Sequence, residues 1–357
     1  KKLNITKPPY SKSDGLYNSA LFDESELINR IINESNARVF CKDPFLIINL
    51  YVALKTKPMA ILTGRNERDQ MALIQSLADI LTDGNLLQFQ MMVGHAWWAE
   101  RSGNVSFFTE AQARFYSYKI FDLVQEALRP ENTNRVFIAY LCHISPAELV
   151  GYFSEVAFQL RHGELMQLPG IHLTKPTPFP HNLFLIGSID SDRFDWWDED
   201  LLSGTTIIQK LDIEREPFKS SLQTSPFVGA GQQFLQARVQ SVWKARRKLK
   251  CILGGGFRAM KPLFQLARLM FRFNQFSEWV WQESLIYLAN AWSENGEGLF
   301  DRVSSRNLMI SLDLVIAQTF LPRLIWSIRH SKALRQQLED RLKNQFPHSL
   351  SVLASIS

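Results

Sequence analysis

The stretch that most constrains this chain is Lys57 to Leu81, which predicts a buried strand, a turn and a helix in direct succession. Met59 to Thr63 is a short apolar run, Gly64 opens a polar turn, and apolar residues then recur at helical spacing as far as Ala78. A strand that leads through such a turn into a helix is the frame of a phosphate-binding loop, because the first N–H groups of the helix can surround an anion.

The residues inside this frame depart from the chemistry that phosphate binding needs. A working loop reads G-x-x-x-x-G-K-[ST], in which the Lys neutralises the terminal phosphates and the Ser or Thr hydroxyl holds Mg²⁺. Counted from Gly64, the second glycine is Asp69, the lysine is Gln70 and the hydroxyl residue is Met71. Each lost charge-assisted hydrogen bond is worth about 1.5 to 3 kcal/mol, and Glu67 and Asp69 add negative charge. We therefore expect no strong binding of a nucleoside triphosphate; the alternative is an α/β unit with no nucleotide-binding ancestry.

Length and composition indicate a globular protein with room for two domains. The 357 residues are 46% hydrophobic and carry a formal net charge of +5, which permits an acidic partner without requiring one. Cys41, Cys142 and Cys251 lie far apart in the sequence, which favours free thiols in a reducing compartment over disulfides or a zinc site. No signal peptide or membrane span is expected from the apolar runs, so we predict a soluble, cytoplasmic protein that does not bind membranes.

Periodicity predicts an α/β region followed by a helical region. Apolar runs typical of buried parallel strands alternate with amphipathic helical patterns, and residues from Gln232 onward are helical in pattern, interrupted at Gly254 to Gly256, Pro262, Asn295 to Gly296 and Pro322. The expected fold class is therefore α/β, a three-layer and mainly parallel core followed by an all-helical domain. The expected strands are 59–63, 88–92, 136–141 and 182–189; the expected divisions are an N-terminal arm 1–22, a core 23–217 and a helical domain 218–357.

Several segments, taken in order, resemble one family. LKTKPMAILTG at 54–64, the segment around Trp97, VFIAYL at 136–141 with GYF at 151–153, NLFLIGSID at 182–190 and LDLVIAQTFLPRL at 312–324 are similar to the AAA+ GTPase of McrBC-type restriction systems, the McrB branch. The likeness covers residues 25–345. It implies a P-loop NTPase (AAA+) core with a helical lid domain.

When the family's catalytic residues are carried over position by position, the resemblance implies that these positions are altered in this chain. The Asp-Glu pair that would hold Mg²⁺ and activate water falls on Cys142 and His143, a nearby Asn on Ser145, and the sensor Asn on Asp190. The arginine finger falls within Leu202 to Gly204 and the sensor arginine of the lid falls near Trp279. Phosphoryl transfer depends on positioning and charge stabilisation, so these changes predict a degenerate NTPase with no catalytic residues, no metal and no bound cofactor.

The resemblance implies a structural or regulatory subunit of a larger assembly. Its expected partners are proteins, with AAA+-type neighbours in a homo- or hetero-oligomer, and the setting would be a prokaryotic defence complex that acts on foreign nucleic acid. The alternative is an NTPase that binds ATP or GTP with a non-standard site or with one completed by a partner subunit.

Three further motifs suggest other chemistry. Cys142-His143 could be a nucleophile or a ligand pair, but adjacent residues of a strand point to opposite faces and no second pair has metal spacing. The acidic run 190–200 resembles a calcium loop but lacks its Gly and its final Glu, so we favour a solvated loop. The basic cluster between 244 and 250 could contact nucleic acid through phosphates, against the alternative of a charged helix face; its residues are Lys244, Arg246, Arg247, Lys248 and Lys250.

Overall fold

The structure is a computed structural model of the 357-residue chain. The residues that it describes are 23–38, 44–64, 67–93, 119–143, 146–162, 178–189, 199–209, 229–254, 260–272 and 278–356. The predicted N-terminal arm, the Trp97 segment, Ser145 and Asp190 lie outside these ranges.

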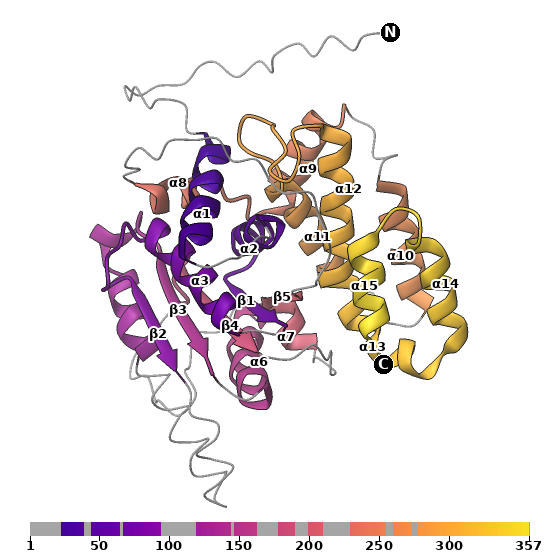
Figure 1. Cartoon of the computed structure of the whole chain (residues 1–357), viewed down its shortest axis with the longest axis horizontal. Coiled ribbons are helices and arrows are strands. Elements are labelled where there is room, and N and C mark those ends of the chain that lie inside the picture. Colours follow the sequence, from indigo (N-terminus) through magenta and orange to yellow (C-terminus); the bar gives the residue numbers. More distant parts are fainter. Residues whose placement is uncertain are drawn as a thin grey trace, which may run out of the picture.

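A five-stranded parallel sheet forms the centre of the α/β region (Figure 1). Its order is β2-β3-β4-β1-β5, and β1 lies with Met59 opposite Leu185 of β4 and Thr205 of β5. The strands are β1 (Met59–Thr63), β2 (Phe89–Val93), β3 (Phe137–Cys142), β4 (Leu183–Ile189) and β5 (Thr205–Gln209). All residues of β1, β3, β4 and β5 are buried, as expected for parallel strands covered on both faces. The α/β class and the parallel sheet are thus confirmed, and β5 is a strand that the sequence pattern did not reveal.

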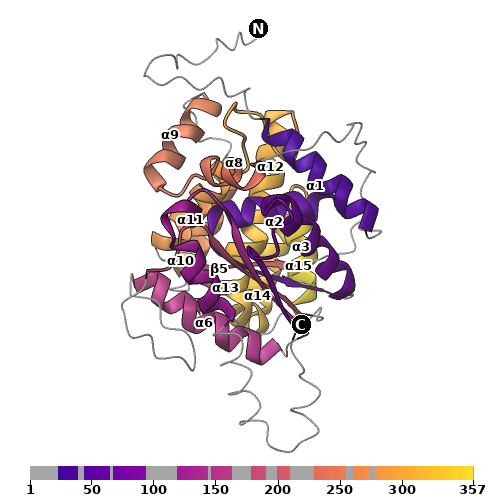
Figure 2. The same ribbon diagram turned by 90° about the vertical axis from the view of Figure 1, so that its left-hand side faces the viewer.

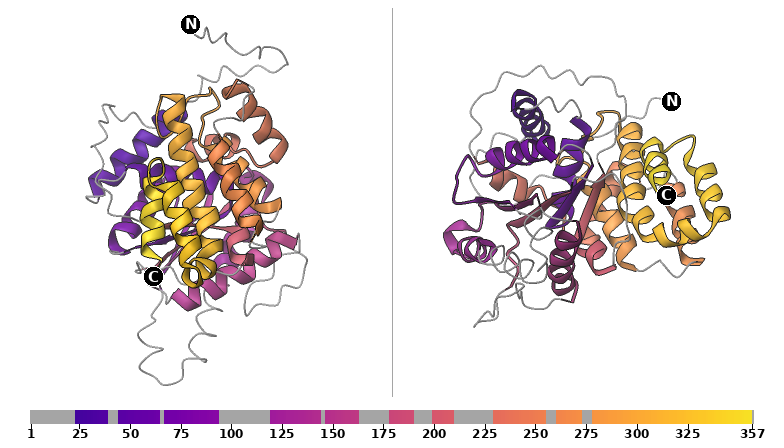
Figure 3. Two further views of the ribbon diagram at one scale, coloured as in Figure 1. Left: turned by 90° about the vertical axis from the view of Figure 1, so that its right-hand side faces the viewer. Right: turned by 60° about the horizontal axis from the view of Figure 1, so that its bottom comes forward.

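Helices cover both faces of the sheet, so the arrangement is compatible with three layers (Figure 3, right). One side carries the indigo and violet helices from the start of the chain, and the other carries the magenta helix that follows β3. The helices of this region are α1 (Glu24–Arg38), α2 (Pro44–Thr56), α3 (Glu67–Leu81), α6 (Pro146–His162) and α7 (Glu199–Gly204), with a further helical stretch at 119–127 and a 3₁₀ turn, η1 (Pro130–Asn132).

The rest of the described chain is helical, as predicted. Its elements are α8 (Ala230–Gln236), α9 (Val242–Ile252), α10 (Lys261–Arg272), α11 (Glu278–Asn290), α12 (Ser304–Val315), the π-helix η3 (Ile316–Phe320), α13 (Leu321–His330), α14 (Lys332–Leu342) and α15 (Pro347–Ser355). Gly254 follows the end of α9 with a φ of +64°, the left-handed conformation in which glycine terminates helices. Pro262 lies in the first turn of α10, where its missing N–H costs no hydrogen bond.

Pro322 does not interrupt the helical pattern, contrary to expectation. Helices α12, η3 and α13 run on without a break from Ser304 to His330, seen as the long orange helix in Figure 3, left. Proline lacks an N–H and its ring clashes with the carbonyl four residues earlier, and the π-turn directly before Pro322 provides the extra residue that accommodates it. By length and composition this helix could cross a membrane, but 83% of its apolar window is buried inside the protein. It is a core helix in the described structure.

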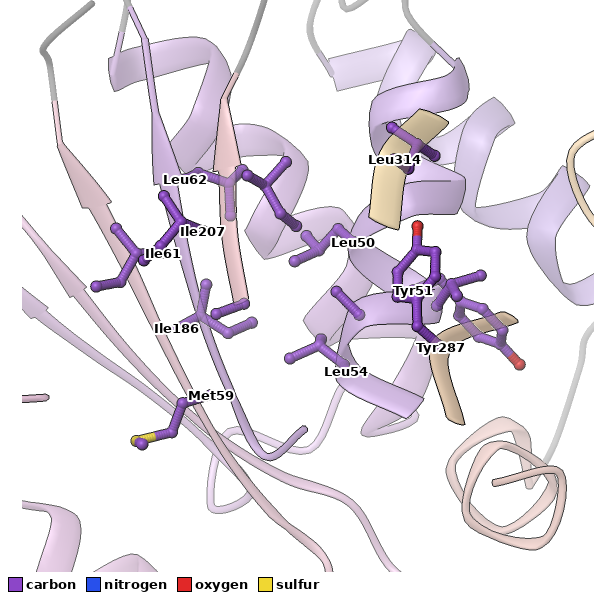
Figure 4. Packing of buried hydrophobic residues seen from close by; sticks show 14 of the residues in the cluster. Leu50, Tyr51, Leu54, Met59, Ile61, Leu62, Ile186, Ile207, Tyr287 and Leu314 are labelled. Carbon is purple, nitrogen blue, oxygen red and sulfur yellow. The ribbon is translucent and has the colours of Figure 1, made fainter. Parts of the chain in front are cut away.

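One hydrophobic cluster extends from the sheet into the helical region. Figure 4 shows Leu50 and Leu54 of α2 between strand residues such as Ile186 and the side chains of Tyr287 in α11 and Leu314 in α12. Helix α8 is part of the same cluster, because the ring of Phe234 packs edge-on against Tyr51 and Phe184. The predicted division at residues 217 and 218 stays a prediction.

Candidate functional site

The carboxyl edge of the sheet brings the predicted phosphate-loop residues together with the ends of β3 and β4. Gly64 follows β1 with a φ of +139°, a conformation that favours glycine, and its N–H donates to the Ile189 carbonyl at 3.2 Å. β4 lies between β1 and β3, so the Cys142 position is two strand spacings, about 10 Å, from the start of the loop. Asp190 is the next residue after Ile189 in sequence and lies outside the described part.

Gln70, at the predicted position of a phosphate-loop lysine, is turned into the protein. Its side chain is 1% exposed, and Nε2 donates to the Gly64 carbonyl at 2.8 Å. The side chain therefore joins the first turn of α3 to the start of its own loop. Its Oε1 has no hydrogen-bond partner, and an oxygen acceptor cannot bind phosphate oxygens, which are also acceptors.

The described neighbours of Gln70, Asp69 and Met71, are not the groups expected to hold a magnesium nucleotide. Met71 is partly buried and packs against the hydrophobic core, so a thioether occupies the place of the metal-binding hydroxyl. Asp69 is half-buried and brings an acidic group to the same turn of α3. The side chain of Glu67 lies outside the described atoms.

At the end of β3, Cys142 and His143 differ sharply in their surroundings. Cys142 is fully buried, with Sγ 3.7 Å from the Met92 carbonyl oxygen of β2. His143 is exposed and has a φ of +54°, so it lies outside the regular strand. The two side chains face different environments, which does not favour a shared metal or a nucleophile pair. Within the described ranges, no group of three His, Cys, Asp or Glu side chains could hold a metal ion.

The predicted arginine-finger segment is part of a packed junction. The Leu202 carbonyl accepts hydrogen bonds from Lys57 Nζ at 2.7 Å and from Arg323 Nη2 at 3.2 Å. Gly204 sits against α6, where an added Cβ would come within 2.7 Å of the Cβ of Ala157. Trp279, near the predicted position of the lid sensor, is 50% exposed at the start of α11.

A buried ion cluster connects the amino edge of the sheet to the helical region, and sequence reasoning missed it. Lys57 Nζ lies 3.0 Å from Glu283 Oε2 of α11, and Arg323 of α13 lies 3.4 Å from the same oxygen. Arg323 also lies 3.3 Å from Glu199 of α7 and donates to the Thr319 carbonyl at 2.8 Å. The Arg323 side chain is 1% exposed. Arg323, the basic residue of the LPRL segment, thus joins α7, α11 and α13. In the sequence, only its charge within an apolar run could have indicated this role.

A second buried pair joins the first two helices. Lys55 Nζ of α2 lies 2.5 Å from Glu24 Oε1 of α1, with side-chain exposures of 0% and 1%. Burial lowers the pKa of Lys55, and the Glu24 carboxylate opposes that shift. Burial and the same carboxylate raise the pKa of Tyr51.

The predicted basic cluster lies on α9 and divides into an outer and an inner set. Lys244, Arg246, Arg247 and Lys250 are exposed. Lys248 points inward, and its Nζ donates to the Trp292 carbonyl at 2.6 Å. The expectation that Lys248 contacts nucleic acid is not supported by this placement.

Lys248 predicts a pH-dependent contribution to stability. Burial, assisted by Lys55, lowers the pKa of Lys248 to about 7, whereas a lysine in the unfolded chain titrates near 10.4. Between these values the unfolded chain binds more protons, so stability rises with pH. We expect the free energy of unfolding of the wild type, relative to Lys248→Met, to increase from about pH 7 to about pH 9 in denaturant titrations. Lys250→Met, an exposed control, should give no such trend; a flat difference for Lys248→Met would contradict the inward placement.

Comparison of the chain with protein-family models, with curated proteins and with solved structures finds no match.

Proposed function

We propose that this protein is a catalytically inactive, AAA+-like structural or regulatory subunit of a larger assembly. The observation that carries the proposal is the Gln70 amide bonded to the Gly64 carbonyl, because this bond uses the side chain that would otherwise reach the phosphates. Met71 packed on the core and the buried Cys142 thiol support the same conclusion. No described side chain at these positions supplies a cation or a magnesium ligand.

The strand order supports descent from an NTPase core. β4, whose end carries the sensor position, lies between the phosphate-loop strand β1 and the strand β3 that carries the acidic positions. Ligands of open parallel sheets bind outside the carboxyl ends of the strands, so a residue at the end of β4 would lie between a nucleotide held after β1 and a metal held after β3. The order of the sheet therefore fits such an ancestor, while the residues at its edge do not retain the chemistry.

An assembly role is supported by the aromatic surface of the helical region. In the described part of the chain, Phe271 is 71%, Trp279 50% and Trp326 67% exposed. A groove of about 610 Å³ between α10 and α11 is lined by Phe264, Ala267, Arg268, Phe271, Glu278 and Trp281. Exposed apolar patches mark protein interaction sites, and this groove, with Phe271 on its wall, is such a patch. AAA+-type neighbours, a cytoplasmic location and a role in defence against foreign nucleic acid belong to the proposal.

Nucleotide titration tests the proposal directly. A ligand present at 100 times its dissociation constant stabilises a protein by about 2.7 kcal/mol, so even weak binding of millimolar ATP or GTP with Mg²⁺ raises the melting temperature. We expect no shift and no heat of binding. Gln70→Ala should lower the free energy of unfolding by about 1 to 3 kcal/mol, because the Gly64 carbonyl loses its partner, and should leave the nucleotide response at zero. Micromolar binding that Gln70→Ala removes would instead establish the alternative, an NTPase with a non-standard site.

A further inference from the structure

The outer face of α9 is a continuous basic surface with an aromatic residue at its centre. Arg246, Lys250, Trp243, Arg247 and Lys244 follow one another around the helix over about half of its circumference, and all five are exposed. Helix α9 contains no Asp or Glu. Figures 1 and 2 show α9 at the end of the molecule away from α6, so this face is separate from the carboxyl edge of the sheet.

The inner face of α9 holds this surface in place. Ala245 and Leu249 are fully buried, and helix α9 packs against α11. Ser241 caps the helix by accepting a hydrogen bond from the Lys244 N–H at 3.3 Å, and Lys248 is bonded to the Trp292 carbonyl. The five outer residues are therefore presented by a fixed helix.

Trp243 is unusual because it is large, apolar and 66% exposed in the middle of cations. The guanidinium of Arg247 lies over its ring, 5.4 Å from the centroid, which occupies one ring face by a cation–π contact. The indole is thus oriented by Arg247 while most of its surface remains open to solvent.

We propose that this face of α9 binds single-stranded nucleic acid. The outer cations contact the phosphates, and a base stacks on the open face of Trp243. From Trp243 to Lys250 the helix spans about 10 Å, enough for about two or three successive phosphates. This inference is independent of the proposed function, because it uses neither the phosphate loop nor a nucleotide.

A single strand fits this surface better than a duplex. Bases in a duplex are stacked on each other, so an exposed indole has no base face to contact there. Unpaired bases are open, and stacking on an aromatic side chain contributes about 1 to 3 kcal/mol per base. Cations that flank a central aromatic residue are the combination that single-strand binding proteins use.

Fluorescence anisotropy of a labelled oligothymidylate of about 20 nucleotides with the full chain tests the proposal. We expect the quadruple variant Lys244→Ala, Arg246→Ala, Arg247→Ala and Lys250→Ala to bind at least tenfold more weakly. Its affinity should also depend less on salt, because the wild-type slope of log K against log salt for about three phosphates is about −2. Trp243→Leu should weaken binding about tenfold without changing that slope, and Trp243→Phe should retain most of the affinity.

A charge-matched control separates the α9 surface from net charge. Lys261→Ala, Arg302→Ala, Lys332→Ala and Lys343→Ala remove four exposed cations that lie outside α9, and this variant should bind like the wild type. Equal weakening by the control set, no binding by the wild type at low salt, or no effect of Trp243→Leu would overturn the proposal. The melting temperature of each variant, measured without ligand, shows that the loss does not come from unfolding.

Discussion

Replacing Arg323 by Met is expected to lower the free energy of unfolding by about 3 to 5 kcal/mol. The guanidinium is buried and contacts Glu283 and Glu199 together with the carbonyls of Leu202 and Thr319. A methionine fills the volume but leaves the Thr319 carbonyl without this donor and the partly buried carboxylate of Glu283 with Lys57 as its remaining cation. Urea titration followed by circular dichroism measures the loss.

Two further variants decide whether the cost comes from the ion cluster. Arg306→Met removes a guanidinium that is 68% exposed and 3.4 Å from Asp301, and exposed pairs contribute less than about 1 kcal/mol. Arg323→Lys keeps the charge but not the planar fork that reaches several acceptors, so its cost should be intermediate. If Arg323→Met and Arg306→Met cost the same, the cluster does not hold α7, α11 and α13 together.

The same cluster bears on the proposed role. It connects the amino edge of the sheet, through Lys57 and Leu202, to the helical region, and Asn290 of α11 adds bonds to Thr56 and to the backbone of Val239. A lid domain that moves during a nucleotide cycle would have to break such contacts in every cycle. Buried ionic contacts at this junction fit a subunit whose two parts keep one arrangement.

The sequence predicted those elements whose pattern is local. The apolar run 59–63, the glycine after it and the helical spacing beyond specify β1 and α3 from neighbouring residues alone. β5 was missed because α7 ends at Gly204 and Thr205 begins the strand with no turn between them, and a five-residue run carries little periodicity. The prediction that Pro322 interrupts the helix was wrong because a π-turn accommodates this proline, and no residue type in the sequence indicates a π-turn.

The candidate site was predictable in identity but not in geometry. The resemblance places Gln70 where a phosphate loop carries its lysine, whereas only the fold shows that the Gln70 amide bonds to the Gly64 carbonyl. Lys248 is indistinguishable from Lys250 by composition, and only the position of Trp292, far along the chain, turns it inward. Arg323 and Lys55 have partners more than 30 positions away, so no local pattern could identify them.

The second large effect on the free energy of unfolding is expected at the pair of Lys55 and Glu24, where replacing one residue and replacing both should have opposite outcomes. Lys55→Met leaves a carboxylate that is 1% exposed without its cation, and breaking a buried pair costs about 3 to 5 kcal/mol. Lys55→Met combined with Glu24→Met removes both charges, and Glu24 Oε2 already lacks a hydrogen bond in this site.

The double variant should therefore recover to within about 1 kcal/mol of the wild type or exceed it, since well-packed apolar residues often replace a buried pair without loss. Denaturant titration of the wild type, Lys55→Met, Glu24→Met and the double variant gives the coupling energy between the two positions. If the losses of unfolding free energy in the two single variants add up in the double variant, the two side chains do not interact, and the ion pair does not contribute to the packing of α1 on α2. Recovery would instead show that these two helices are held mainly by apolar contacts, which include Leu27, Ile31 and Tyr51.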